Sequence, residues 1–217
     1  MNPLFCNVRY IFFDVGSTIS NEDYGMALRF DKQASTAEAK ALGVTADDIR
    51  ERLYALASEG KQDFYRAARS LGLTDIIPYD PSHEQLYPGT VPALTALSEH
   101  YRMGIIANQC DGLLGRLEHF GILGYFDTVI SSFDVKLQKP DPAIFRLAMG
   151  KAGVEACECV MVGDRPDNDI FPAKALGMKT VWLKQSMGAM QRVRGPEYAA
   201  DAEADDIAGV AALLLPR

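Results

Sequence analysis

Short apolar runs alternate with helical patterns along most of this chain, and this alternation limits the possible folds more than any other feature of the sequence. Each run is brief enough to be a strand that is buried on both faces of a sheet. The runs occupy residues 8–13, 103–107, 128–130, 159–162 and 180–183. Helical patterns separate the later runs, as at Leu113, Leu117 and Phe120. Strand–helix alternation of this kind predicts an α/β fold with a doubly wound parallel sheet.

The segment from about residue 21 to residue 82 is different, because it contains helical patterns but no strand-like apolar run. Thr45 and Asp48 approximate a capping box at the start of one of these helices. The patterns predict helices over residues 27–42, 49–57 and 64–71. We therefore expect a small α-helical cap that is inserted after the first strand. The expected core domain comprises residues 1–19 and 83–217, and the expected cap domain comprises residues 20–82.

Composition narrows the range of partners and compartments. The 217 residues carry a net charge of −7, without a cluster of Lys and Arg, which argues against a nucleic-acid or anionic-membrane partner. The sequence shows no apolar stretch of membrane-spanning length, and its first nine residues lack the pattern of a signal peptide. The four cysteines form no Cys-x-x-Cys pair and are expected to be reduced thiols. We expect a cytoplasmic protein.

Polar side chains follow three of the predicted strands. Asp14 comes directly after Phe13, Asn108 follows the second run, and Asp164 follows the fourth. Lys139 lies in a Lys-Pro-Asp-Pro loop that precedes a helical pattern. Because the carboxyl ends of parallel strands share one edge of a sheet, where ligands bind, we expect these four residues to converge on one volume.

The residue types at these positions favour phosphoryl-transfer chemistry. Asp14 and Asp164, with Asp169 behind them, offer the hard oxygen ligands that Mg²⁺ prefers. Lys139 supplies a point charge to a phosphoryl oxygen. Phosphoryl transfer depends mainly on positioning and on charge stabilisation, which these groups provide. The Asp14 carboxylate is also suited to act as a nucleophile, forming an aspartyl phosphate that water later hydrolyses.

Four motifs in order resemble those of the haloacid dehalogenase-like (HAD) hydrolase superfamily, along nearly the whole chain. Residues 14–18, Asp-Val-Gly-Ser-Thr, resemble motif one, which is Asp-x-Asp-x-Thr. Residues 105–108, Ile-Ile-Ala-Asn, resemble motif two, and residues 139–142, Lys-Pro-Asp-Pro, resemble motif three. Residues 163–169, Gly-Asp-Arg-Pro-Asp-Asn-Asp, resemble motif four, and the helical insert matches the family's cap between motifs one and two.

This resemblance implies a Rossmann-like core, a Mg²⁺ cofactor and a role for each matched residue. Asp14 would be the nucleophile, Lys139 would hold the phosphate and orient Asp14, and the backbone N–H of Asn108 would bind a phosphoryl oxygen. The implied metal ligands are Asp14, the backbone carbonyl of Gly16, and Asp164, with Asp169 supporting them directly or through water.

Two positions depart from the family's pattern. Gly16 stands where the family's phosphatases carry the acid that protonates the leaving group and then activates water, a role typically worth about 10²–10⁴-fold in rate. Ala107 stands where a Ser or Thr hydroxyl normally binds the phosphate, a bond worth on the order of 1.5–3 kcal/mol. Glu22 and Asp23, shortly after motif one, are candidates to replace the missing acid because they are near in sequence.

Three functions are therefore weighed. The favoured one is a Mg²⁺-dependent hydrolase of a small phosphorylated metabolite, slowed by the loss of an acid at Gly16. Gly16 and Ala107 also motivate an alternative, a weak or inactive HAD-like protein that binds a phosphorylated ligand or a protein partner. A dehalogenase that uses Asp14 on carbon would need no metal, so Asp164 and Asp169 argue against it.

Overall fold

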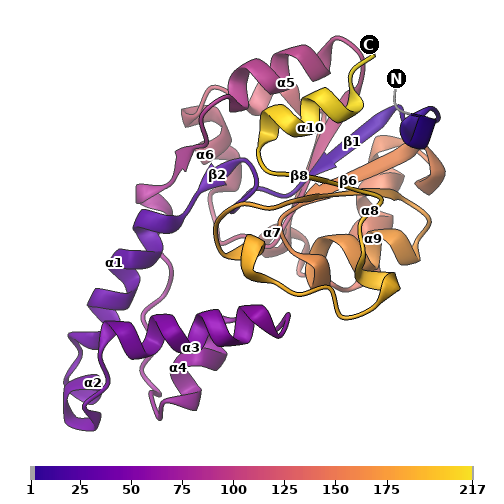
Figure 1. The fold of residues 1–217 in the computed structure, drawn as a ribbon. Helices are drawn as coiled ribbons and strands as arrows, with labels where there is room; N and C mark the ends of the chain where they lie inside the picture. Colours follow the sequence, from indigo (N-terminus) through magenta and orange to yellow (C-terminus); the bar gives the residue numbers. More distant parts are fainter. Residues whose placement is uncertain (1–2, 217) are drawn as a thin grey trace.

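A sheet of six parallel strands forms the centre of the computed structural model, which describes residues 3–216. Figure 1 shows helices on both faces of this sheet. The strand order is β5-β4-β1-β6-β7-β8. The strands are β1 (Tyr10–Phe13), β4 (Arg102–Ala107), β5 (Thr128–Ser131), β6 (Cys159–Gly163), β7 (Lys179–Leu183) and β8 (Ala202–Ala204). The predicted doubly wound α/β fold is confirmed.

The central strand β1 is buried on both faces, as its unbroken apolar sequence predicts. Ile11 and Phe13 pack into the cluster shared with α5, α6 and α10, whereas Tyr10 and Phe12 pack into the cluster shared with α8. This division follows from the strand's alternation of side chains between faces. The helices of the first layer are α5 (Thr90–Ser98), α6 (Leu113–His119) and α10 (Ile207–Leu214). Those of the second are α7 (Ser132–Val135), α8 (Pro142–Ala152) and α9 (Phe171–Ala175).

All five apolar runs of the sequence are strands, but the sheet has a sixth strand that the pattern did not predict. The sixth strand, β8, has the sequence Ala-Glu-Ala and pairs with β7 in parallel register, with Leu183 opposite Ala204. As an edge strand it needs little apolar character. Its three residues therefore produce no signal that distinguishes them from a loop.

Residues 23–70, which follow β1, form four helices with a hydrophobic cluster of their own. The capping box of Thr45 and Asp48 is present. The predicted single helix over residues 27–42 is wrong, because the chain breaks there into two helices. The first ends at Ala34, with Ser35 as its C-cap, and the Thr36 side chain caps the second by accepting a hydrogen bond from the backbone N–H of Ala39 at 3.2 Å. The four helices are α1 (Asp23–Ala34), α2 (Ala37–Leu42), α3 (Ala46–Ser58) and α4 (Phe64–Ser70).

Two short strands connect this helical segment to the sheet. The strand β2 (Ser20–Asn21) leaves the core and pairs antiparallel with β3 (Gln85–Leu86), on which the chain returns. In Figure 1 the helices α1 to α4 extend to one side of the sheet beyond this pair. The expected boundaries at residues 20 and 82 lie near β2 and β3, and the division into two domains remains a prediction. Residues 1, 2 and 217 of the expected core lie outside the described residues.

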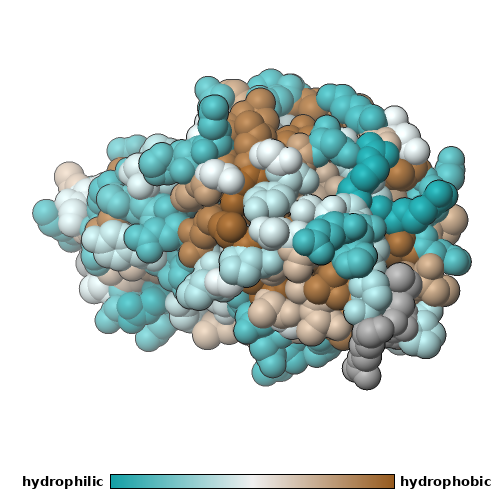
Figure 2. All heavy atoms as spheres, turned by 90° about the horizontal axis from the view of Figure 1, so that it is seen from above, coloured by the Kyte–Doolittle hydropathy of each residue, from teal (hydrophilic) through white to brown (hydrophobic). Residues whose placement is uncertain are grey.

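Within residues 3–216, helices that combine enough length with enough apolar character to cross a bilayer are absent. On the face shown in Figure 2, hydrophobic residues gather near the middle and polar residues cover most of the rest. Apolar atoms make up about half of a normal protein surface, so we infer no partner from this distribution. All four cysteines are free thiols.

Candidate active site

The site forms at the point where the strand order of the sheet reverses direction. The central strand β1 lies between β4 and β6, and the chain proceeds from β4 to β5 on one side and from β6 to β8 on the other. Such a switch point opens a crevice at the carboxyl ends of the strands. Asp14 is the first residue beyond β1, and its backbone N–H donates to the carbonyl oxygen of Val162 at 2.9 Å. The sheet itself therefore holds Asp14 at the crevice.

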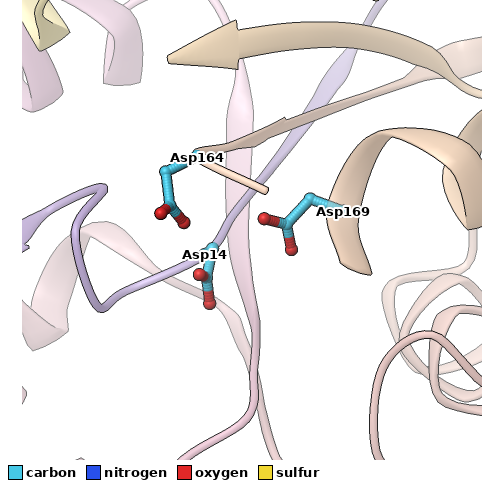
Figure 3. A group of neighbouring side chains, drawn as sticks. All are labelled: Asp14, Asp164 and Asp169. Carbon is cyan, nitrogen blue, oxygen red and sulfur yellow. The ribbon is translucent and has the colours of Figure 1, made fainter. Parts of the chain in front are cut away.

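Three buried carboxylates face one another in this crevice. Asp14, Asp164 and Asp169 each present an oxygen atom, and these atoms lie within 4.8 Å of one another. Asp14 and Asp164 extend from the ends of neighbouring strands, and Asp169 approaches them from the adjacent helical turn (Figure 3). That turn is a single π-helical turn over Pro166–Ile170. The structure thus brings together the three acids that the sequence predicted for the metal site.

A buried lysine joins two of these acids. The Nζ atom of Lys139 lies 2.8 Å from Oδ1 of Asp14 and 2.6 Å from Oδ1 of Asp169. Only 3% of Lys139 is exposed. Burial by itself lowers the pKa of Lys139, but the charges of Asp14 and Asp169 outweigh burial and raise the pKa above its ordinary value. Lys139 is therefore a permanent positive charge at the floor of the site.

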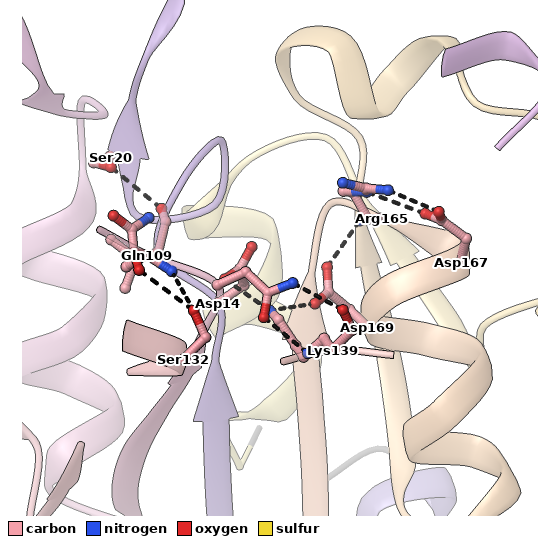
Figure 4. A network of polar contacts seen from close by, with 10 residues as sticks. Asp14, Ser20, Gln109, Ser132, Lys139, Arg165, Asp167 and Asp169 are labelled. Atoms are coloured by element: carbon pink, nitrogen blue, oxygen red, sulfur yellow. Dashed lines mark hydrogen bonds and ion pairs between the residues drawn. The ribbon is translucent and has the colours of Figure 1, made fainter. Parts of the chain in front are cut away.

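Asn108 holds the backbone of Lys139 in place. Its side-chain Nδ2 donates to the carbonyl oxygen of Lys139 at 2.9 Å, and its Oδ1 accepts from the backbone N–H of Lys139 at 2.8 Å. Figure 4 shows Lys139 within the wider network of polar contacts around Asp14 and Asp169. The two hydrogen bonds tie the loop after α7 to the end of β4. The Asn108 side chain thus supports the lysine.

Asp169 is packed against Gly163, the residue before Asp164. A Cβ atom on Gly163 would lie 2.4 Å from Cγ of Asp169, so that position has no room for a side chain. The Oδ2 atom of Asp169 accepts a hydrogen bond from the backbone N–H of Arg165 at 3.0 Å. Sequence reasoning gave Gly163 no role beyond its motif; the structure shows that it makes space for Asp169.

Burial raises the pKa values of two of the three clustered acids. It raises the pKa of Asp169 to about 6, against the opposing effect of Lys139. Burial also raises the pKa of Asp164 well above its ordinary value, and the nearby charges of Asp169 and Asp14 add to this effect. Lys139 pairs with Asp14 and Asp169 but not with Asp164. A hard divalent cation would supply further positive charge and prefers oxygen ligands of this kind, so the donor set fits Mg²⁺.

A small cavity of about 110 Å³ opens onto the cluster. Five of the six predicted site residues line it, namely Asp14, Gly16, Asn108, Lys139 and Asp164. Asp169, the sixth, lies behind them and reaches the site through Lys139. The remaining lining residues are Ser17, Glu22, Gln62, Gln109, Arg165 and Asn168. Of these, Gln62 lies 46 residues after Gly16, in the connection between α3 and α4, and had no recognisable signal in the sequence.

A larger cavity, of about 480 Å³, lies elsewhere. It is formed by α1, α3 and the 3-10 helix Ser186–Met190, and its walls include Met26, Phe30 and Tyr54. None of the three clustered acids lines it. We therefore place the chemistry in the smaller cavity, where the charges gather.

The two candidates for the missing acid are separated by the structure. Glu22 lines the small cavity beside Asp14 and Gly16, whereas Asp23 lines the larger cavity and accepts a hydrogen bond from the Ser186 hydroxyl. Glu22 is half-buried. Desolvation, with the negative charges of Glu84 and Asp14, raises the pKa of Glu22 to about 8.

Taken together, the doubly wound sheet and a strand-end Asp paired with a buried Lys define a class of α/β hydrolase. A sequence profile described as haloacid dehalogenase-like hydrolase matches residues 11–183. The chain belongs to this family, which confirms the resemblance found in the four motifs.

Known relatives agree with this assignment. The phosphoserine phosphatase of Thermus thermophilus is 30% identical over 80% of this chain and 68% of its own length. The glyceraldehyde 3-phosphate phosphatase of Pyrococcus abyssi is 44% identical over 45% of this chain, and the match spans 42% of that protein. A HAD phosphatase from Thermococcus onnurineus has a crystal structure that matches with a TM-score of 0.66 and 29% identity, covering 95% of this chain and 98% of that one.

Proposed function

We propose that this protein is a Mg²⁺-dependent phosphatase that hydrolyses a small phosphorylated metabolite through an aspartyl phosphate on Asp14. The observation that carries the proposal is the placement of the Asp14 carboxylate against Lys139, at 2.8 Å, inside a cavity that two further acids adjoin. The names of the relatives, a phosphoserine phosphatase and a glyceraldehyde 3-phosphate phosphatase, support this substrate class. The second match spans less than half of that relative, so we extend to this chain only the class of substrate.

In the proposed reaction, an oxygen of the Asp14 carboxylate attacks phosphorus while the bond from phosphorus to the leaving-group oxygen breaks. Water then attacks the phosphorus of the aspartyl phosphate, and inorganic phosphate leaves as the Asp14 carboxylate is restored. Lys139 orients Asp14 and stabilises negative charge on the phosphoryl oxygens. The Asn108 side chain is engaged with Lys139, so its backbone N–H is the group that we assign to a phosphoryl oxygen.

We assign the metal to Asp14, the backbone carbonyl of Gly16, and Asp164, with Asp169 in support. Bound Mg²⁺ supplies positive charge to the phosphoryl group. The raised pKa values of Asp164 and Asp169 support this assignment, because burial and then the charges of neighbouring acids disfavour these carboxylates in the absence of a cation. The proposed ligand at Gly16 is its backbone carbonyl oxygen, which is present whether or not the residue has a side chain.

A panel of phosphorylated substrates tests the proposal. Phosphoserine, glyceraldehyde 3-phosphate, acetyl phosphate and 4-nitrophenyl phosphate are each assayed with Mg²⁺ and with a chelator. We expect turnover that requires Mg²⁺ and that Asp14→Asn abolishes. Chelator-resistant turnover, or full activity in Asp14→Asn, would contradict the proposal.

The same panel separates the two alternative functions. No turnover of any substrate, together with thermal stabilisation by one of them, would identify a binding protein, as Gly16 and Ala107 first suggested. Halide release from 2-chloropropionate in the presence of chelator would identify a dehalogenase.

We further propose that the protein works in the cytoplasm, without a nucleic-acid or membrane partner. Its four free thiols are typical of a reducing compartment. Its net charge of −7 disfavours anionic polymers and surfaces.

A further inference from the structure

The carboxyl group of Glu22 fills the space that a side chain at position 16 would need. A Cβ atom on Gly16 would lie 2.4 Å from Oε1, 2.6 Å from Cδ and 2.7 Å from Oε2 of Glu22. Contacts under 3 Å exclude both groups from the same place at once. An Asp at position 16 and the observed position of Glu22 are therefore alternatives, and this chain has adopted the second.

The backbone around motif one explains how Glu22 reaches this place. After Asp14 the chain makes a tight turn in which the backbone N–H of Ser17 donates to the carbonyl oxygen of Ser20 at 2.8 Å. Gly16 and Ser20 form an isolated bridge, so the chain lies back on itself. The strand β2 follows at once, and Glu22 comes next, as the residue before α1. The turn thus brings a residue six positions later in the chain back over Gly16.

The anchoring of this turn is independent of Glu22's own side chain. Ser20 and Asn21 pair with Leu86 and Gln85 in the β2–β3 ladder. The carbonyl oxygen of Glu22 accepts the backbone N–H of Met26 at 2.8 Å, which starts the first turn of α1. A change in the Glu22 side chain therefore leaves intact the backbone contacts that position it.

Glu22 lies among the charged residues of the candidate active site. Glu22 lines the same small cavity as Asp14, Lys139 and Asp164. Glu84 and Asp14 act on it with negative charge, and Arg116 acts with positive charge. The Glu22 carboxyl group therefore lies on the wall of the cavity in which we place the phosphoryl group, next to Gly16.

We propose that Glu22 is the general acid and base of this enzyme, in place of the acid that Gly16 lacks; this inference rests on the proposed phosphatase function. As the bond between phosphorus and the leaving-group oxygen breaks, the Glu22 carboxyl group gives its proton to that oxygen. The Glu22 carboxylate then takes a proton from the water molecule that attacks the aspartyl phosphate. One turnover returns Glu22 to its protonated form and releases an alcohol and inorganic phosphate.

Two aryl esters test this assignment with one variant and a matched control. Phenolate is a poor leaving group that needs a proton, whereas 4-nitrophenolate leaves readily as an anion. We expect Glu22→Gln to lower kcat for phenyl phosphate by about 10²–10⁴-fold, the usual contribution of general acid–base catalysis. The loss for 4-nitrophenyl phosphate should be much smaller, and KM should change little for either ester. Glu51→Gln, which alters an exposed carboxylate on α3, should match the wild type on both esters.

A double variant exchanges the two acid positions. Glu22→Ala removes the carboxyl group and empties the space beside Gly16, so that Gly16→Asp can be accommodated in the same chain. We expect kcat for phenyl phosphate to be at least about tenfold higher in the double variant than in Glu22→Ala, because the double variant again has an acid at the site.

The outcomes separate this inference from the proposed function. Equal losses on both esters in Glu22→Gln, or a double variant no better than Glu22→Ala, would overturn the role of Glu22 while leaving the phosphatase function standing. Lack of Mg²⁺-dependent turnover by the wild type, both of these esters and of every substrate in the panel, would overturn both. A loss confined to phenyl phosphate, restored in the double variant, supports both.

Discussion

Lys139 and Asp169 form an ion pair in which both side chains are buried, with Nζ 2.6 Å from Oδ1. The same ammonium group lies 2.8 Å from Asp14. One lysine therefore neutralises part of the charge on a proposed nucleophile and on an acid that supports the proposed metal site. A buried pair of this kind contributes to stability only while both partners are present, because each charge has lost its water.

Replacement of Lys139 should therefore destabilise the protein. Lys139→Met leaves Asp14 and Asp169 buried without their counter-charge, and removal of one partner of a buried pair typically costs about 3–5 kcal/mol. Urea unfolding in the presence of chelator measures this change in the free energy of unfolding. Lys151→Met, an exposed position on α8, is the control and should change stability by less than about 0.5 kcal/mol. Equal stability of the two variants would show that Lys139 contributes little to the stability of the buried carboxylates.

Asp164 should have opposite effects on stability with and without Mg²⁺. In the absence of metal, Asp164→Asn removes a buried carboxylate that Asp169 and Asp14 repel. We expect the melting temperature to rise by a few degrees, since about 1 kcal/mol corresponds to roughly 2–4 °C for a chain of this length. Added Mg²⁺ should raise the melting temperature of the wild type by mass action and leave Asp164→Asn unchanged. A Mg²⁺-dependent rise that persists in Asp164→Asn would place the metal elsewhere.

Glu22 should make stability depend on pH. Its pKa is about 8 in the folded protein against an ordinary value of 4.5, so between these values the folded state holds a proton that the unfolded state has lost. Stability that Glu22 contributes is therefore present at low pH and lost as pH rises through about 8. Melting temperatures of the wild type and Glu22→Gln are measured with chelator from pH 5 to 9. As pH rises, the melting temperature of the wild type should fall relative to that of Glu22→Gln. Parallel curves would mean that the folded protein does not alter the titration of Glu22.

Gly163 should tolerate no side chain, whereas Gly115, which has open space around it, should tolerate one. Gly163→Ala places a Cβ atom 2.4 Å from Cγ of Asp169, and overpacking of this kind costs about 1–3 kcal/mol. The displaced Asp169 should also lower kcat by loosening Lys139. The matched control is Gly115→Ala within α6, where a Cβ atom meets nothing within 4 Å and helix propensity favours Ala by up to about 1 kcal/mol. Thermal unfolding and turnover of 4-nitrophenyl phosphate test the contrast, which fails if both variants behave alike.

Much of the architecture was predictable because it depends on local patterns. Five runs of apolar residues predicted five strands, and the polar residues that follow three of them predicted Asp14, Asn108 and Asp164 at one edge of the sheet. Residues that follow parallel strands lie at one edge of the sheet, because the carboxyl ends of the strands meet there. The strand β8 and the break at Ser35 escaped prediction, because three residues of an edge strand and a single helix cap carry weak local signals.

Proximity in sequence did not separate Glu22 from Asp23 as the substitute for the acid missing at Gly16. Both follow motif one, and both have a carboxyl group. Their side chains diverge because the turn before β2 and the pairing of β2 with β3 set the direction in which each residue points. Glu22 lines the cavity beside Asp14, whereas Asp23 lies at the other cavity.

The sequence by itself determined the fold and the family and predicted six of the residues that lie at the candidate site, because periodicity and motif order are properties of the chain. Tertiary structure decided which atoms meet. Lys139 reaches Asp169 across 30 residues, Gly163 makes room for that acid, and the carboxyl group of Glu22 occupies the space that Gly16 leaves open. Contacts of this kind depend on the packing of distant segments, and packing is settled only when the whole chain has folded.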